Sequence, residues 1–121
     1  MARILVIDDE QPIRDLLKKA LEKAGHGVEV APNGKVGIEI QHQHPADLVI
    51  TDLFMPEKEG LETIMELKRD FPDIKIIAIS GGDRKGTLDF LPMSEKLGAH
   101  IAMKKPFTIS EVLEAVNNLL G

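Results

Sequence analysis

Apolar runs alternate along this chain with segments whose apolar residues repeat at helical spacing. Five short runs are typical of strands, and they lie at 4–7, 28–31, 48–51, 75–80 and 100–104. Five further segments carry a helical pattern, and they lie at 12–24, 34–43, 61–71, 88–97 and 109–120. Alternation of strand and helix with short links predicts an α/β fold, in which helices cover both faces of a parallel sheet.

The predicted helices differ in how clearly the sequence marks them. Segment 12–24 is the clearest, because its apolar residues form one stripe and Pro12 suits a first helical turn. Segment 88–97 is the weakest, because Pro92 interrupts its start. Segment 109–120 can begin at an N-cap supplied by Thr108 or Ser110.

Polar side chains stand where four of the predicted strands end. Asp8 and Asp9 follow the first strand, Asp52 follows the third, Ser80 ends the fourth and Lys105 follows the fifth. The carboxyl ends of parallel strands meet at one edge of the sheet, which is where such folds bind ligands. Carboxylates gathered there repel each other unless a proton, a lysine or a divalent cation relieves them. Oxygen ligands suit Mg²⁺, and a remaining carboxylate can attack phosphorus.

Each of these residues alone has a more ordinary interpretation. Asp9 can simply cap the helix that starts at Pro12, and a serine after a strand is common. The pair Lys104 and Lys105 can be solvated. The joint occurrence of all of them at strand ends favours a site. The pair His42 and His44 points apart on a helix, so we expect a solvated helix end there.

Composition and charge exclude several other classes of protein. A chain of 121 residues that is 43% hydrophobic fits one domain spanning 1–121. The absence of cysteine removes disulfides and thiolate chemistry, and it fits a cytoplasmic location. The acids at Asp8 and Asp9 follow too short an apolar run for a signal peptide or a membrane span. A net charge of −5, with no Trp or Tyr, argues against nucleic acid as the main partner.

At these residues the sequence resembles the receiver domain of bacterial two-component response regulators, particularly the single-domain, chemotaxis-regulator-like kind. The resemblance covers the whole chain, and it rests on ILVIDDE at 4–10, DLVITDLFMPEKEGLE at 47–62, IIAISG at 76–81 and KKPF at 104–107. It implies a flavodoxin-like, doubly wound sheet in the order 2-1-3-4-5 with five helices. It also implies a phosphorylation-dependent switch in a phosphorelay, with a sensor histidine kinase or phosphotransfer protein and an unknown downstream protein as partners, and a monomer or weak dimer.

The resemblance also implies a role for each residue of the site. Asp52 is the implied phosphoacceptor, and Ser80 and Lys105 are expected to contact the phosphoryl group. The implied Mg²⁺ is held by Asp9 and Asp52, by Asp8 largely through water, and by the backbone carbonyl of Phe54. The Lys105–Pro106 bond is expected to be cis, and Lys104 to have no role in the site.

The sequence departs from the family in two places that concern switching. Ala102 stands three residues before Lys105, where relatives often have an aromatic switch residue, so signalling is expected to use loop and helix movement instead. The stretch from Ser80 to Lys105 is a few residues longer than usual and rich in glycine near its start.

Three other functions stay open at this point. A phosphatase or mutase that forms an aspartyl phosphate also uses a strand-end acid and Mg²⁺, but it commonly needs a second acid where Phe54 stands. A flavodoxin-like cofactor module shares the topology but needs a hydroxyl-rich loop after the first strand and aromatic walls. A receiver fold that is never phosphorylated would be a constitutive docking module, which the complete set of site residues disfavours.

Overall fold

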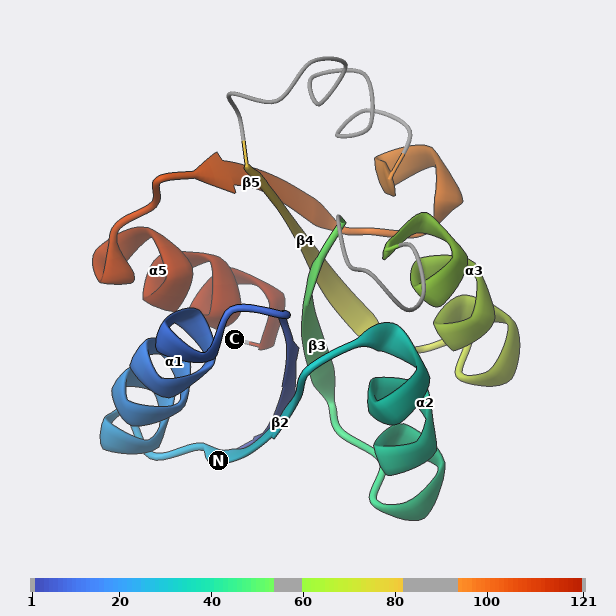
Figure 1. Ribbon diagram of the computed structural model, residues 1–121, viewed down its shortest axis with the longest axis horizontal. Coiled ribbons are helices and arrows are strands. Elements are labelled where there is room, and N and C mark those ends of the chain that lie inside the picture. The colour runs from blue at the N-terminus through green and yellow to red at the C-terminus, as the bar shows by residue number, and fades with distance from the viewer. Residues whose placement is uncertain (1, 54–59, 82–93, 121) are drawn as a thin grey trace.

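A computed structural model gives the fold, and it describes residues 2–53, 60–81 and 94–120 (Figure 1). The expected carbonyl ligand at Phe54 and the first part of the predicted helix 88–97 lie outside these residues. The strands are β1 (Arg3–Ile7), β2 (Gly27–Ala31), β3 (Leu48–Asp52), β4 (Lys75–Gly81) and β5 (Ile101–Lys105). The helices are α1 (Gln11–Lys23), α2 (Gly34–Gln43), α3 (Gly60–Asp70) and α5 (Ile109–Leu120), and residues 94–97 are also helical.

The strands form one parallel sheet in the order β2-β1-β3-β4-β5, which confirms the predicted topology. The register sets Ile7 beside Thr51 and Asp52 beside Ile79. In the outer pair, Gly81 lies beside Lys105. The ends of β1, β3, β4 and β5 therefore lie within one or two residues of one another, so residues placed there share one edge of the sheet.

Helices cover both faces of the sheet, with α1 and α5 on one side and α2 and α3 on the other (Figure 1). Alternate residues of the strands feed two separate apolar cores. Ile50 and Ile77 pack in the core that holds Leu17 of α1 and Val116 of α5. The other core is built from the remaining strand residues with α3, and residues of α2 pack against it. Because the central strands are buried on both faces, their sequences are apolar without alternation.

Local signals at the helix ends explain where the helices begin. Asn33 caps α2, because its Oδ1 accepts a hydrogen bond from Val36 N at 2.9 Å. At α5, Thr108 Oγ1 accepts from Glu111 N at 3.1 Å while Glu111 Oε1 accepts from Thr108 N at 2.7 Å. This reciprocal pair is a capping box, and it selects Thr108 over Ser110 as the N-cap.

The interpretation of Asp9 as the cap of α1 is wrong. The N-cap residue is Glu10, and no side chain caps this helix. Pro12 occupies the first turn, as predicted, and needs no hydrogen-bond acceptor there. Asp9 is therefore left exposed next to β1, with its carboxylate available to the site.

Within the parts of the chain that the structure describes, no helix combines the length and the apolarity needed to cross a membrane.

Candidate functional site

Three carboxylates meet at the shared edge of the sheet. Asp8 directly follows β1, and Asp52 is the last residue of β3, so neighbouring strands deliver both. Oxygen atoms from Asp8, Asp9 and Asp52 all lie within 4.8 Å of one another. Asp8 and Asp52 are buried, at 1% and 5% exposure, whereas Asp9 is exposed. One side of the cluster is thus closed by protein and the other is open to solvent.

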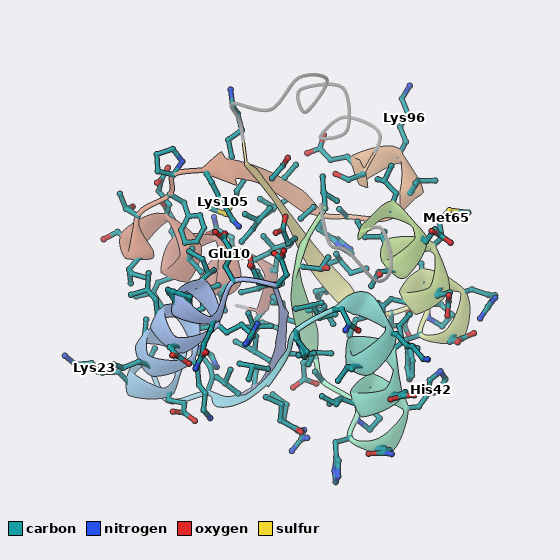
Figure 2. All side chains as sticks on the ribbon, viewed as in Figure 1. Glu10, Lys23, His42, Met65, Lys96 and Lys105 are labelled. Atoms are coloured by element: carbon teal, nitrogen blue, oxygen red, sulfur yellow. The ribbon has the colours of Figure 1, made fainter. Side chains whose placement is uncertain are left out.

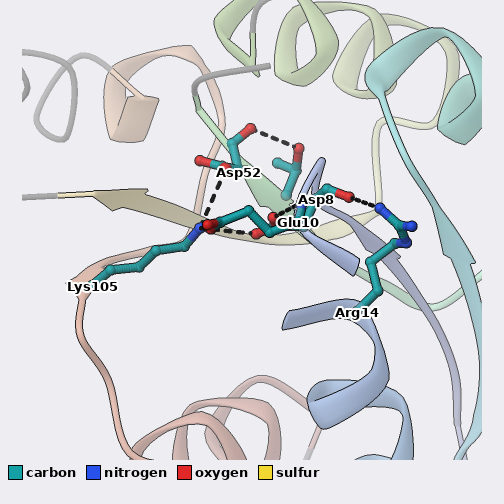
Figure 3. A network of polar contacts seen from close by, with 6 residues as sticks. Asp8, Glu10, Arg14, Asp52 and Lys105 are labelled. Carbon is teal, nitrogen blue, oxygen red and sulfur yellow. Dashed lines mark hydrogen bonds and ion pairs between the residues drawn. The ribbon is translucent and has the colours of Figure 1, made fainter. Parts of the chain in front are cut away.

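The ammonium group of Lys105 lies among these acids and partly neutralises them (Figure 3). Its Nζ is 2.9 Å from Glu10 Oε1, 3.1 Å from Asp8 Oδ2 and 3.4 Å from Asp52 Oδ2. Burial disfavours the charged amine, but the hydrogen bond to Glu10 and the charges of Asp52 and Asp8 outweigh burial and raise the pKa of Lys105. Lys105 is therefore a permanent cation at the edge of the site.

Asp8 is the acid that burial affects most. Desolvation raises the pKa of Asp8 above its usual value of 3.8, although the hydrogen bond from Glu10 N and the nearby Lys105 both oppose this rise. The hydrogen bond joins Glu10 N to Asp8 Oδ1 at 2.9 Å. Arg14 Nη1 donates to the carbonyl oxygen of Asp8 at 2.8 Å. These contacts fix the turn between β1 and α1 against the site.

Two buried hydroxyls lie at the ends of the neighbouring strands β3 and β4. Thr51 Oγ1 donates to the carbonyl oxygen of Asp52 at 3.1 Å. Ser80 is fully buried, and within the described parts of the chain its Oγ has no hydrogen-bond partner. An unpaired buried hydroxyl costs free energy. The hydroxyl of Ser80 is therefore available to donate a hydrogen bond beside the strand that carries Asp52.

The backbone around the site leaves no room for a larger residue at the start of α3. A Cβ built on Gly60 would lie 2.4 Å from the carbonyl oxygen of Asp52 and 2.4 Å from Leu53 Cα. Gly60 N also donates to Leu53 O at 3.1 Å.

The Lys105–Pro106 bond is cis, as expected. Lys104 is exposed.

The donor set fits a hard divalent cation. Carboxylate oxygens from Asp8, Asp9 and Asp52 can approach one point together, and His and Cys ligands are absent from this group of residues. The two histidines of 42–44 do not belong to it. His42 is half exposed at the far end of the molecule in Figure 2, where its Nε2 lies 3.1 Å from Asp70 Oδ2.

Glu10 and Arg14 are contacts of the site that the sequence patterns did not reveal. Glu10 is the third acid of the DDE stretch, and its place one residue beyond the aspartate pair is the signal that could have marked it. Figure 2 shows Glu10 and Lys105 close to each other. Arg14 carried no signal, because a basic residue in a surface helix is common.

Comparisons with known proteins place this architecture in a family. The model of the response regulator receiver domain matches residues 4–117. The chain is 33% identical over 118 residues to sporulation initiation phosphotransferase F of Bacillus subtilis, covering 98% of this chain and 93% of that protein. It is 32% identical over 120 residues to the response regulator receiver protein CpdR of Brucella abortus, covering 99% and 98%. The chain belongs to the receiver domains of two-component response regulators, which are phosphorylatable signalling switches.

The solved structures agree with this assignment. A response regulator receiver domain protein from Clostridium thermocellum superposes with a TM-score of 0.91 at 34% identity, covering 99% of this chain and 94% of that one. Other relatives are much longer. The transcriptional regulator NtrC of Azospirillum brasilense is 34% identical over 120 residues, and this chain spans 24% of its length.

Proposed function

We propose that Asp52 accepts a phosphoryl group from a sensor histidine kinase or a phosphotransfer protein, and that the acyl phosphate changes a partner-binding surface. One observation carries the proposal: the carboxylate of Asp52 lies at the end of β3 within 4.8 Å of oxygens of two other acids, beside the fixed cation of Lys105. Asp52 is thus a carboxylate that faces a cluster able to offset the charge of an incoming phosphate.

Mg²⁺ is the proposed metal, held by Asp8, Asp9 and Asp52 and by the carbonyl of Phe54. When bound, the ion neutralises charge on the phosphoryl oxygens. A carboxylate oxygen of Asp52 attacks phosphorus, the new O–P bond forms, and the P–N bond to the donor imidazole breaks with its electron pair leaving on nitrogen. Asp9 is the exposed acid of the three, whereas Asp8 and Asp52 are buried.

Lys105 and Ser80 are the residues proposed to detect the phosphoryl group. Lys105 already contacts Asp52, and a more negative group at that position would draw its ammonium further in. Ser80 has a buried hydroxyl with no partner among the residues that the structure describes, so it gains a hydrogen bond only if a new acceptor arrives. The hydrogen bond of Ser80 would exist only in the phosphorylated state, and the contact of Lys105 would be stronger there. Such differences between two states shift the equilibrium between them.

The chemistry proposed for the domain is limited to its own aspartate. The domain would support attack by Asp52 on the donor and later hydrolysis of the acyl phosphate by water. Lys105 and the proposed metal site would stabilise the developing charge in both reactions. A single domain over 1–121, a monomeric or weakly dimeric state, a cytoplasmic location and the absence of direct nucleic-acid binding stay predictions. Sedimentation of the unphosphorylated and phosphorylated protein would measure the oligomeric state.

The test is phosphorylation by a small donor, read by intact mass. The wild-type protein is incubated with acetyl phosphate and Mg²⁺ next to Asp52→Asn, which keeps the shape of the side chain, and Asp15→Asn, which removes an exposed acid of α1. We expect a phosphate-sized gain in the wild type and in Asp15→Asn only. A gain that persists in Asp52→Asn would place the acceptor elsewhere, and no gain in the wild type would favour a docking module that is not phosphorylated.

A further inference from the structure

The side chain of Glu10 reaches into the site, although the proposed reaction gives it no role. Its Oε1 accepts a hydrogen bond from Lys105 Nζ at 2.9 Å. That distance is the shortest of the three contacts between this ammonium and carboxylates of the described residues, since Asp8 lies at 3.1 Å and Asp52 at 3.4 Å. The contact joins positions 95 residues apart and ties the β1–α1 turn to the end of β5 (Figure 3).

The backbone of Glu10 is held by local hydrogen bonds, whereas its side chain extends away from them to Lys105. Glu10 N donates to Asp8 Oδ1 at 2.9 Å, and Glu10 O accepts from Ile13 N and Arg14 N at 3.1 Å each. Glu10 is the N-cap of α1, but its carboxylate makes no capping hydrogen bond. The carboxylate is turned to Lys105 instead, and 58% of the side chain is exposed.

The ammonium of Lys105 has no donor to spare in this arrangement. An ammonium carries three N–H donors, and three carboxylates surround this one. A phosphoryl group on Asp52 would bring new acceptor oxygens, one of which can replace the present contact with the Asp52 carboxylate. To donate to a second phosphoryl oxygen, Lys105 must give up Asp8 or Glu10. Asp8 is buried, and leaving its carboxylate unpaired is costly. Glu10 is exposed, so water can replace Lys105 there at small cost.

We propose that Glu10 is a positioning residue that competes with phosphorylated Asp52 for Lys105. In the resting protein Glu10 holds the ammonium at the mouth of the site, and it releases the ammonium when the phosphoryl group arrives. Glu10 therefore weights the equilibrium toward the resting conformation. This inference rests on the proposed function of Asp52, because it needs a phosphoryl group as the rival acceptor.

The first test measures how tightly the site binds a phosphoryl analogue. Beryllium fluoride is titrated in the presence of Mg²⁺ into the wild type, Glu10→Gln and Asp15→Asn, with amide NMR signals as the readout. Glu10→Gln removes the charge and keeps the shape, and Asp15→Asn removes an exposed charge on the same helix. We expect Glu10→Gln to bind roughly two- to fivefold more tightly, the range for loss of an exposed ion pair. Asp15→Asn should match the wild type.

A double-mutant cycle separates competition for Lys105 from plain repulsion of the anion. In a Lys105→Met background, Glu10→Gln should no longer change the affinity for beryllium fluoride. Equal tightening in both backgrounds would mean that Glu10 only repels the ligand, which overturns the proposal. Unchanged or weaker binding in Glu10→Gln alone also overturns it, as does equal tightening in Asp15→Asn.

A readout that needs no metal and no phosphoryl analogue completes the test. The NMR signals of the Lys105 ε-methylene group are compared in metal-free wild type, Glu10→Gln and Asp15→Asn. The proposal requires these signals to move in Glu10→Gln and to stay in place in Asp15→Asn, and unmoved signals in Glu10→Gln would overturn it. Failure of the wild type itself to bind beryllium fluoride would instead overturn the proposed function of Asp52.

Discussion

Two buried hydroxyls on neighbouring strands differ in their hydrogen bonds, and this difference can be measured. Thr51 Oγ1 donates to Asp52 O, whereas Ser80 Oγ has no partner among the residues that the structure describes. We expect Thr51→Val to lower the free energy of unfolding by about 1 kcal/mol, since a hydrogen bond is lost. Ser80→Ala should leave the free energy of unfolding unchanged or raise it, because no bond is lost and an unpaired buried hydroxyl is removed. Chemical denaturation of the unphosphorylated proteins measures both.

Binding of a phosphoryl analogue should affect the two variants in the opposite way, with Ser80→Ala losing more of the stabilisation by the analogue than Thr51→Val does. Beryllium fluoride with Mg²⁺ stabilises the protein that binds it, and Ser80→Ala should lose part of that gain because its hydroxyl is missing. Thr51→Val should keep the gain. If Ser80→Ala is as destabilising as Thr51→Val in the resting protein, the hydroxyl of Ser80 is already paired, and its role as a reserved donor fails.

The raised pKa of Asp8 predicts a pH dependence of stability in the metal-free protein. Folded Asp8 holds its proton more tightly than the unfolded chain does, so folding is favoured while the group is protonated. Its contribution to stability is lost as the pH rises from 3.8 through the raised pKa. Asp8→Asn does not titrate, so its stability relative to the wild type should rise across that range.

The measurement is urea denaturation at a series of pH values with a chelator present. Asp15→Asn serves as the control, because it removes an exposed acid that lies outside the cluster of Asp8, Asp9 and Asp52. A difference between Asp8→Asn and the wild type that falls with pH would show that Lys105 stabilises ionised Asp8 by more than burial penalises it.

At the scale of elements, the close approach of α3 to the end of β3 depends on Gly60. A Cβ at this position would lie 2.4 Å from Asp52 O and from Leu53 Cα, and backbone atoms cannot turn aside as a side chain can. We expect Gly60→Ala to lower the free energy of unfolding by about 1–3 kcal/mol and to displace the strand end that carries Asp52. Thermal unfolding and the amide NMR shifts of β3 measure the two effects.

Gly27 offers the matched control for that substitution. It lies at the start of β2, where a Cβ would meet nothing within 4 Å. Gly27→Ala should therefore be neutral or slightly stabilising. If Gly60→Ala is equally well tolerated, the start of α3 can shift without disturbing Asp52, and the tight contact is not what positions the acid.

Much of the element order could be predicted from the sequence because burial dictates it. The central strands are covered on both faces, so their runs are apolar throughout, and α2 begins where Asn33 caps it. The predicted helix 12–24 ends close to the observed end of α1 at Lys23, and Gly25 follows with a φ of 102°, a conformation that favours glycine. The alternative interpretation of Asp9 as a helix cap was wrong, because a cap and an exposed acid look alike in a sequence until the first helical residue is known.

The site could be predicted only in part, because strand ends can be located from the sequence but contacts between turns beyond them cannot. Asp8, Asp52 and Lys105 were found because each stands at a strand end, and the register of a parallel sheet brings strand ends together. Glu10 follows a strand end by three positions, and its contact with Lys105 depends on how two turns approach across the edge. No periodicity encodes that approach.

At the scale of the whole molecule, the proposed metal site would join parts of the chain that are far apart in sequence. Its acids come from the ends of β1 and β3, which are neighbours in the middle of the sheet, so binding should stabilise the entire fold. At ten times its dissociation constant, Mg²⁺ should raise the free energy of unfolding by about 1.4 kcal/mol. Removal by a chelator should reverse the gain. The slowest amides of β1, β3 and β4 should report it as slower hydrogen exchange.

Asp9→Asn separates this global coupling from a local effect of the ion. Asp9 is exposed and caps no helix, so its loss should leave the metal-free fold within about 0.5 kcal/mol of the wild type while removing most of the gain from Mg²⁺. Asp15→Asn should keep the full gain. Slower exchange restricted to the turn after β1, with unchanged amides in β3 and β4, would contradict global coupling, because an ion held by Asp8, Asp9 and Asp52 would have to be released before β1 or β3 could unfold.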